Sequence, residues 1–388
     1  MKVARTRHVR RLRDLLRRYP VVALLGARQV GKTWLARQIV AAEKGPTHYF
    51  DLEDPADHQL FVEPALALRQ FEGLVVLDEI QRLPGLFPVL RVLADRPGSP
   101  ARFLVLGSAS PDLLRHGAET LAGRIAFHEL PGFDFQEAGA GSLQRLWLRG
   151  GFPMSFLSRT DTQSLEWRKF FVRTFLERDL PALGIALPPE AMWRFWTMLA
   201  HYHGQTFNAS ELARSFGISH TTVHRYLDIL TGAFVITQLR PWAENVGKRL
   251  VKAPKIYVTD SGLFHALMDV RSLDALRVHP KLGASWEGLL LHQVLQQLSI
   301  RREERFFWAT HGGAELDLLV LQQGHRVGFE FKRTELPRVT ASMRVALETL
   351  RLDRLLLVHA GSRSFDLEPA VRAVAASSLV RELRQMAS

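Results

Sequence analysis

Runs of apolar residues alternate with amphipathic stretches in the first third of the chain. Val21–Leu25, Leu74–Leu77 and Phe103–Leu106 are unbroken apolar runs, which is typical of strands buried on both faces of a sheet. A helix is expected from Trp34 to Ala42, between the first two runs. Strands of this kind alternating with helices predict a parallel α/β sheet.

The pattern changes in the middle of the chain, in Ala209–Trp242. Apolar residues are spaced there as in two short helices that pack across a turn at Gly217, with Ser219 capping the second helix. The following AFVITQLRPW alternates as a strand pair would. The segment therefore predicts a winged helix-turn-helix, whose second helix would present His220, Thr221, Thr222, His224 and Arg225 outward. Such a helix can contact DNA, or it can serve as a lid or docking module.

From Lys281 onward the pattern predicts a helix, three strands, a helix and a strand. Glu287 would lie in the first turn of the first helix. Glu315 and Asp317 share a face of the second strand, while Glu330 and Lys332 share a face of the third, because side chains two apart point to the same side. Asp317, Glu330 and Lys332 can therefore meet in a pocket, with Glu287 above it.

Composition narrows the class of protein. At 388 residues the chain is expected to form two or three domains. It has no cysteine, which removes disulfides and thiolate metal sites and suits a cytoplasmic location. No apolar run approaches the roughly 18 residues that span a membrane, so we expect no membrane partner.

Charge favours a polyanionic partner. The net charge is +12, and the first twenty residues hold eight Lys or Arg and one Asp. Val9, Leu12, Leu16 and Tyr19 recur at helical spacing within this stretch, which predicts an amphipathic helix with an arginine face. That face can be simply solvated, or it can contact nucleic acid or a membrane surface.

The clearest chemical motif follows the first apolar run. GARQVGKT matches G-x-x-x-x-G-K-[ST] and lies between a predicted strand and a predicted helix. Backbone N–H groups of such a loop surround phosphates, its lysine reaches the β- and γ-phosphates, and its hydroxyl holds Mg²⁺. We therefore predict ATP and Mg²⁺ as ligands, bound by Gly26, Ala27, Arg28, Gln29, Val30, Gly31, Lys32 and Thr33.

Polar residues follow the other two apolar runs. Asp78 and Glu79 come at the carboxyl end of their strand, where open α/β sheets bind ligands. Asp78 would position Mg²⁺ and Glu79 would polarise the attacking water. Ser108 can sense the γ-phosphate or can simply occupy a turn. Arg124 can act as an arginine finger on a neighbouring subunit's nucleotide, which would require a homo-oligomer, or can be an ordinary surface arginine.

These motifs together resemble a prokaryotic AAA-type ATPase family whose members carry G-x-R-Q-x-G-K-T, L-D-E-[IV]-Q, L-x-G-S and S-L-x-G-R. The chain has GARQVGKT, LDEIQ, VLGSAS and TLAGR in that order. The resemblance covers residues 10 to about 137. It implies a P-loop ATPase domain with Lys32, Glu79, Ser108 and Arg124 in catalytic positions.

The acidic residues near the end resemble a different centre, that of the PD-(D/E)xK phosphodiesterases. In those enzymes carboxylates bind one or two metal ions and a lysine orients the nucleophile. The resemblance implies metal ligands at Glu287, Asp317 and Glu330, with Lys332 beside them. A charged, solvated sheet face is the alternative.

The second half also resembles an uncharacterised domain that usually follows this ATPase. It carries GGFP, LERDL, a D-x-G-L segment and E-L-D before E-F-K. We therefore predict three parts: residues 1–140 as an AAA-type P-loop ATPase domain, 141–270 as connecting helices with a winged helix-turn-helix, and 271–388 as a PD-(D/E)xK-like domain.

Together these features predict an ATP-hydrolysing protein that acts on DNA through the winged helix and the nuclease-like domain. Whether the latter cleaves DNA stays open. The alternative is an ATP-gated regulatory switch that works through protein contacts, with the last domain as a catalytically dead scaffold.

Overall fold

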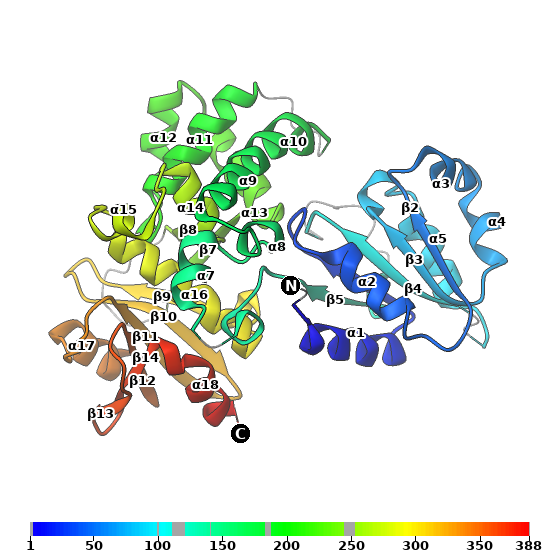
Figure 1. The fold of residues 1–388 in the computed structure, drawn as a ribbon. Helices are drawn as coiled ribbons and strands as arrows, with labels where there is room; N and C mark the ends of the chain where they lie inside the picture. Colours follow the sequence, from blue (N-terminus) through cyan, green and yellow to red (C-terminus); the bar gives the residue numbers. More distant parts are fainter. Residues whose placement is uncertain are drawn as a thin grey trace. The chain divides into compact units, whose positions relative to one another are not determined.

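The computed structural model describes residues 3–98, 101–110, 121–139, 141–182, 188–243 and 253–387. The chain forms two compact units, drawn as a ribbon in Figure 1. The first contains Met1–Gly132 and Tyr226–Val235, and the second contains Phe133–Arg225 and Ile236–Ser388. Each is described by itself.

The first unit is built on a five-stranded sheet in the order β2-β3-β4-β1-β5, and all its strands are parallel. The strands are β1 (Val21–Leu25), β2 (Thr47–Asp51), β3 (Gly73–Asp78), β4 (Ala101–Gly107) and β5 (Ile125–Glu129). The helices are α1 (Thr6–Arg18), α2 (Lys32–Val40), α3 (Pro55–Leu60), α4 (Pro64–Arg69), η1 (Ile80–Arg82) and α5 (Leu86–Ala94). The predicted parallel α/β sheet is confirmed.

Helices cover both faces of this sheet (Figure 1). On one face, alternate residues of β1, β3 and β4 form a core with Leu68 of α4 and Leu90 of α5. Helices α1 and α2 lie against the other face. Helix α1 has the predicted amphipathic form, because Leu12 and Leu16 are buried. Its exposed side carries the basic residues Arg10, Arg11, Arg17 and Arg18.

The second unit contains a nine-stranded sheet in the order β13-β14-β12-β11-β10-β9-β7-β8-β6. The strands are β6 (Gln205–Thr206), β7 (Ile236–Pro241), β8 (Lys255–Val258), β9 (Arg305–Ala309), β10 (Glu315–Gln322), β11 (His325–Lys332), β12 (Arg354–His359), β13 (Phe365–Glu368) and β14 (Val371–Ala375). Strand β7 pairs with β9 in parallel. The predicted parts 141–270 and 271–388 therefore share one sheet.

The helices of this unit pack around the sheet and against one another. They are α6 (Phe135–Ala138), α7 (Leu143–Arg149), α8 (Pro153–Phe156), α9 (Asp161–Thr174), the π-helix η3 (Phe175–Asp179), α10 (Leu180–Ala182), α11 (Pro189–His201), α12 (Ala209–Phe216), α13 (His220–Gly232), α14 (Ser261–Leu267), α15 (Leu273–Arg277), α16 (Leu282–Leu298), η4 (Arg302–Glu304), α17 (Ala341–Leu350), η5 (Ala376–Ser378) and α18 (Leu379–Ala387). Helix α13 is divided between the units, because its residues from Tyr226 onward belong to the first. Helix α16 and α18 border one apolar core and α17 borders another.

Backbone carbonyls and a carboxylate hold α7, α9 and α14 together. The buried Arg168 donates to Leu148 O (3.1 Å) and Gly262 O (2.8 Å). Asp260 caps α14 by accepting from Leu263 N, and it also accepts from Gly151 N at 2.6 Å. A Cβ at Gly262 would lie 2.2 Å from Arg149 O, so only glycine fits there. The GGFP and D-x-G-L segments thus meet in one packed junction.

The helix-turn-helix segment has the two predicted helices, α12 and α13. Gly217 ends α12 in the left-handed conformation, and Ser219 Oγ accepts from Thr222 N at 3.0 Å. The predicted strand pair within AFVITQLRPW is wrong: this stretch forms the single strand β7, whose antiparallel partner is β8. Residues 244–252 between them lie outside the described residues. The winged-helix classification stays a prediction.

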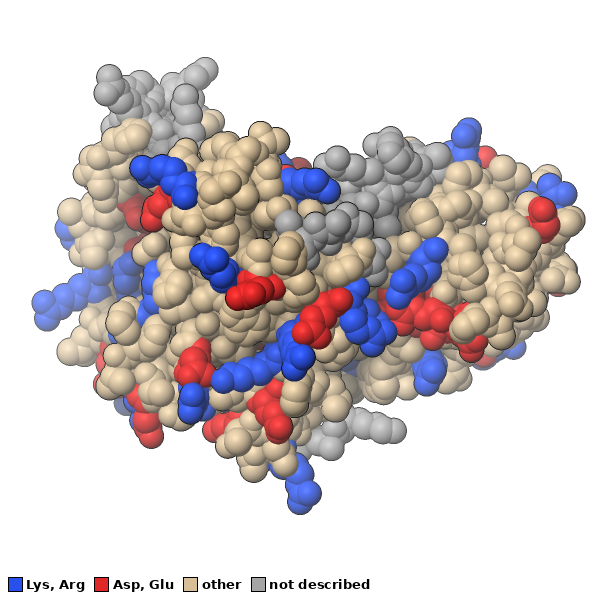
Figure 2. Space-filling model, turned by 90° about the horizontal axis from the view of Figure 1, so that it is seen from above, with Lys and Arg blue, Asp and Glu red and all other residues tan. Residues whose placement is uncertain are grey.

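The C-terminal order of helix, three strands, helix and strand is as predicted. Helix α16 begins at Leu282, so Glu287 lies in its second turn, not its first. Strands β13 and β14 and helix α18 extend the pattern beyond the prediction. On the face that Figure 2 presents, basic and acidic side chains lie interspersed. No helix among the described residues is long and apolar enough to cross a membrane.

Two histidines form a buried pair between α1 and β5. His8 Nδ1 and His128 Nε2 are 2.9 Å apart, so one ring donates a hydrogen bond to the other. Burial, helped by nearby Arg5 and other positive charges, lowers the pKa of His8 to about 2 and that of His128 to about 4. The pair is therefore stable only while it is neutral.

We predict that the first unit loses stability in acid through this pair. In the unfolded chain both histidines bind a proton near pH 6.5, so stability begins to fall as the pH drops below about 6.5 and goes on falling until the folded pKa of each histidine is reached, about 4 for His128. Between about pH 7.5 and pH 5 the unfolding free energy should fall by roughly 1–2 kcal/mol per histidine.

Urea unfolding at both pH values measures this loss. The His128→Gln variant should show a smaller loss than wild type, whereas His58→Gln, a change at an exposed histidine of the same unit, should match wild type. Equal losses in wild type and His128→Gln would contradict the assignment.

Candidate functional site

The loop between β1 and α2 has the backbone of a phosphate cradle. Gly31 precedes α2 with φ 102°, a left-handed conformation that favours glycine. A Cβ at Gly26 would lie 2.4 Å from Leu130 O, so the loop comes too close to its neighbour for a side chain. Helix α2 begins at Lys32, and its N-terminus adds a partial positive charge beside the loop.

The ammonium group of Lys32 is held by neutral oxygens. Its Nζ donates to Gly26 O, Ala27 O and Ser108 Oγ, each at 3.0 Å. The side chain is 4% exposed. None of these three acceptors is charged. They stabilise the ammonium group through hydrogen bonds but do not cancel its charge.

Asp78 lies at the end of β3 and meets the loop through a hydroxyl. Thr33 Oγ1 donates to Asp78 Oδ2 at 2.8 Å, and Tyr49 Oη donates to the same oxygen at 2.5 Å. Burial and the contact with Asp78 raise the pKa of Tyr49, so the phenol stays protonated and donates. Thr33 and Asp78 thus form the pair that P-loop proteins use around Mg²⁺.

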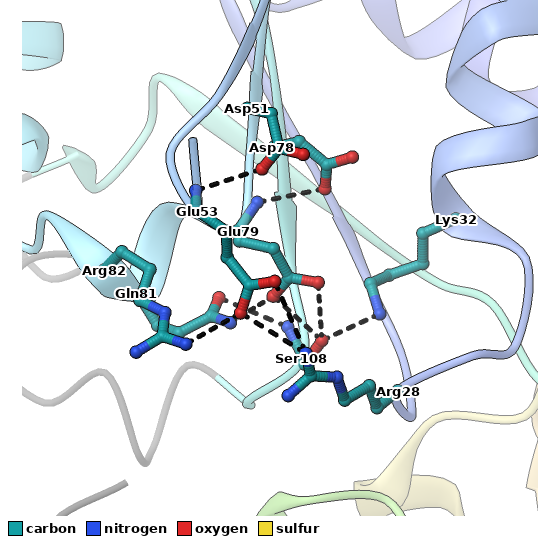
Figure 3. A network of polar contacts seen from close by, with 9 residues as sticks. All are labelled: Arg28, Lys32, Asp51, Glu53, Asp78, Glu79, Gln81, Arg82 and Ser108. Atoms are coloured by element: carbon teal, nitrogen blue, oxygen red, sulfur yellow. Dashed lines mark hydrogen bonds and ion pairs between the residues drawn. The ribbon is translucent and has the colours of Figure 1, made fainter. Parts of the chain in front are cut away.

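Glu79 is joined to Lys32 through Ser108, as Figure 3 shows. The Ser108 hydroxyl accepts from Lys32 and donates to Glu79, with Oγ–Oε2 3.1 Å. Gln81 donates its amide N–H to the same carboxylate and accepts from Ser108 N at 3.3 Å. Glu79 has φ 55°, an uncommon conformation for a residue with a side chain. The carboxylate of Glu79 points toward Ser108 (Figure 3).

Two ion pairs to one carboxylate also hold the loop. Arg28 and Arg82 both contact the carboxylate of Glu53, with Nη2–Oε1 distances of 3.3 Å and 2.7 Å (Figure 3). Glu53 follows β2, so it ties the phosphate loop to the segment after Glu79. All three side chains are partly exposed, which limits the stability that the pairs add.

Arg124 is far from this centre. It directly precedes β5, beside Val21 at the amino end of β1, whereas the phosphate loop follows Leu25 at the other end. A five-residue strand spans about 16 Å. Arg124 therefore cannot serve its own chain's nucleotide, and it pairs with Asp95 at 2.5 Å. Its role as a finger in a homo-oligomer stays a prediction. Thr120 of the TLAGR motif lies outside the described residues.

The acidic residues of the second unit also come together. Lys332 Nζ is 2.7 Å from Glu330 Oε1 and 3.9 Å from Asp317 Oδ2. Asp317 and Glu330 lie where the β10–β11 ladder ends: Phe331 N donates to Asp317, and Asp317 N donates to Glu330. Phe329 and Phe331 pack in the apolar core that α16 borders.

A lysine that the sequence analysis missed lies among these acids. Lys255 Nζ is 3.5 Å from Glu287 Oε1 and 3.7 Å from Asp317 Oδ1, and it is paired with Glu315. It is only 4% exposed. The three carboxylates outweigh burial and raise its pKa, so it stays charged.

Burial raises the pKa of two glutamates in this centre, Glu287 and Glu330, with the neighbouring Asp317 adding to the effect of burial in both and a lysine opposing it. Among the described residues no group of three or more His, Asp and Glu side chains is arranged to hold a metal ion. The predicted metal role of Glu287, Asp317 and Glu330 finds no support in this arrangement.

Sequence reasoning thus found Lys32, Thr33, Asp78, Glu79 and Ser108, which the structure brings together. It missed the phenol of Tyr49 and the link through Gln81, although Gln81 belongs to the LDEIQ motif. It also missed Lys255, whose one signal is a lysine at the start of the otherwise apolar strand KIYV.

Comparison with known proteins places the nucleotide site in a family. The sequence profile of the AAA domain matches residues 18–139. Profiles of two domains of unknown function, DUF8612 and DUF4143, match residues 140–274 and 282–379. Together with its parallel sheet and phosphate loop, the AAA match identifies the first unit as an AAA-type P-loop ATPase domain.

Two relatives are similar to this chain over most of their length. They are the uncharacterised proteins Rv2008c of Mycobacterium tuberculosis and Mb2031c of Mycobacterium bovis. Each is 49% identical over 380 residues, which cover 98% of this chain and 85% of the relative.

Solved structures show weaker likeness. The Walker-type ATPase PABY2304 of Pyrococcus abyssi is 16% identical, over 69% of this chain and 96% of its own, with a TM-score of 0.49. The RuvB Holliday junction branch migration motor of Thermotoga maritima is 19% identical, over 61% and 90%, with a TM-score of 0.29. Neither likeness bears on function.

We predict that the Tyr49 hydroxyl positions Asp78 for catalysis. Tyr49→Phe should lower kcat about fivefold, since one hydrogen bond contributes about 1 kcal/mol, and should leave ATP affinity nearly unchanged. Steady-state turnover measured across a range of free Mg²⁺ tests this. The matched control is Tyr202→Phe, which removes a phenol from a carboxylate in the second unit. A Tyr49→Phe enzyme with wild-type kcat at every Mg²⁺ concentration would rule the role out.

Proposed function

This chain belongs to the family of the two uncharacterised mycobacterial proteins, and on that premise and its AAA domain we propose that it hydrolyses ATP to ADP and phosphate. The observation that carries the proposal is the hydrogen-bonded chain from Lys32 through Ser108 to Glu79. It links the group that would bind the γ-phosphate to the group that would polarise water.

Each residue has a defined part in this reaction. ATP would lie in the cradle of residues 26–33, and Mg²⁺, held near Thr33 and Asp78, would offset phosphate charge. Glu79 would take a proton from the attacking water while the water oxygen bonds to the γ-phosphorus. The bond between the γ-phosphorus and the oxygen that bridges to the β-phosphate would break, and ADP would leave. Lys32 would stabilise the charge that develops on the phosphate oxygens.

Two substitutions separate binding from chemistry. Lys32→Ala should lose both ATP binding and turnover, because it removes the cation that faces the phosphates. Glu79→Gln should keep binding but lower kcat by about 100-fold or more, the usual contribution of a positioned general base. Fluorescent-nucleotide binding and phosphate release measure the two properties. Turnover at the wild-type rate in Lys32→Ala would refute the proposal.

We further propose that the ATP cycle acts on DNA. Helix α13 exposes His220, Thr221 and Arg225, and α1 exposes an arginine-rich face. Within the first unit, Ser110 N, two residues after Ser108, donates to Gly232 O at the end of α13 with a distance of 2.8 Å. A change at Ser108 on hydrolysis therefore has a short covalent and hydrogen-bonded route to this helix.

The proposed action on DNA is tested by measuring the rate of ATP turnover with and without duplex or single-stranded DNA at two salt concentrations. DNA should bind and change the ATPase rate at low salt, and the effect should fade as salt rises, because bound phosphates release counterions. Arg10→Gln with Arg17→Gln should reduce the salt slope by about 0.9 for each DNA phosphate that an arginine no longer neutralises. The matched control is Arg381→Gln with Arg384→Gln, two exposed arginines of α18.

A second candidate is an ATP-gated switch that works through protein contacts. The burial of Lys255 among the C-terminal acids favours it, because that domain then lacks the metal centre of a nuclease. No DNA binding and no rate change at low salt, with ATP turnover intact, would select this candidate over the first.

A further inference from the structure

The C-terminal acidic centre contains a cation supplied by the chain itself. Lys255 opens β8, whereas the acids come from α16, β10 and β11. Its ammonium lies within 4 Å of carboxylate oxygens on Glu287, Glu315 and Asp317. One positive charge thus faces three carboxylates from two separate elements.

The same carboxylates also accept hydrogen bonds from other protein donors. Tyr257 Oη donates to Glu287 Oε1 at 2.6 Å. Phe331 N donates to Asp317 Oδ2 at 2.9 Å. Glu330 accepts from Asp317 N at 3.3 Å and pairs with Lys332 at 2.7 Å. The acidic side chains are therefore satisfied without any further cation.

A divalent ion and this ammonium compete for one position. A hard cation such as Mg²⁺ or Mn²⁺ needs several carboxylate oxygens at about 2.0–2.6 Å. An ammonium group beside the same oxygens would repel it, and moving the lysine aside would place a charge in the apolar surroundings of β8 at high cost. Tyr257 and Ile256, which follow Lys255 in this strand, are fully buried.

We propose that Lys255 is the resident cation of this centre and takes the position that a metal ion would have. The domain then binds no divalent cation there. The ion cluster instead ties β8 to α16 and β10, and thereby holds together the middle and C-terminal segments that share the nine-stranded sheet. This inference does not depend on what the ATPase acts on.

Removing the ammonium should convert the cluster into a metal site. Lys255→Gln leaves Glu287, Glu315 and Asp317 without their shared counter-ion and opens space between them. Mn²⁺ titration without nucleotide, followed by electron paramagnetic resonance of the free ion, measures binding directly. We expect Lys255→Gln to gain a Mn²⁺ site that wild type lacks, and Mn²⁺ to raise the melting temperature of that variant only.

The matched control is Lys332→Gln. It removes a positive charge from the same centre, but its side chain is 47% exposed and it leaves Lys255 in place. This variant should gain no site. In Lys255→Gln with Asp317→Asn, the gained site should disappear. A folded Lys255→Gln protein that binds no more Mn²⁺ than wild type would overturn the proposal.

If Lys255→Gln does not fold, a second comparison, in which Lys255 is unchanged, still tests the proposal. Wild type, Asp317→Asn and Glu315→Gln should bind Mn²⁺ equally, because any ion they share sits elsewhere, for example near Thr33 and Asp78. Circular dichroism checks that both variants are folded. If wild type binds a Mn²⁺ ion that either folded variant does not bind, the acids hold a metal beside Lys255 and the proposal is wrong.

Discussion

The pairing of a buried ammonium group is the interaction on which both centres depend. A lysine that is removed from water must be surrounded by acceptors, and the kind of acceptor decides what it can still do. Lys32 donates to two carbonyl oxygens and a hydroxyl, all of them neutral acceptors. Lys255 faces carboxylates, so its charge is already matched. The first arrangement fits the anion site that we propose for ATP, and the second fits the proposal that Lys255 takes the place of a metal ion.

The ATPase centre could be predicted from sequence because its residues either lie in one short loop or directly follow parallel strands. The loop that holds Lys32 is contiguous, and parallel strands bring Asp78 and Ser108 to the same edge of the sheet. Tyr49 escaped prediction because nothing in a lone tyrosine within THYFD indicates that its hydroxyl meets Asp78. That contact follows from β2 lying next to β3, a neighbour relation that the sequence pattern leaves open.

In the second unit, the order of the elements could be predicted from the sequence but the pairing of distant strands could not. The order of its C-terminal helix and strands was predictable, and so was the shared pocket of Asp317, Glu330 and Lys332. The parallel pairing of β7 with β9 was not, because no periodicity within either strand specifies a partner so far along the chain. That pairing, with β8 on the other side of β7, brings Lys255 to the acids. The lysine beside these carboxylates thus comes from a strand that lies outside the carboxylate motif.

The strain at Glu79 connects the chemistry to the rest of the first unit. A left-handed residue with a side chain costs about 1–3 kcal/mol and persists only where its surroundings require it. Here Ser108 and Gln81 both hold the carboxylate, so any change in phosphate contacts at Lys32 alters the forces on Ser108 as well. Ser108 lies at the end of β4, and Ser110 is bonded to the end of α13. The serine that holds the carboxylate of Glu79 therefore lies two residues from the serine that contacts the end of α13.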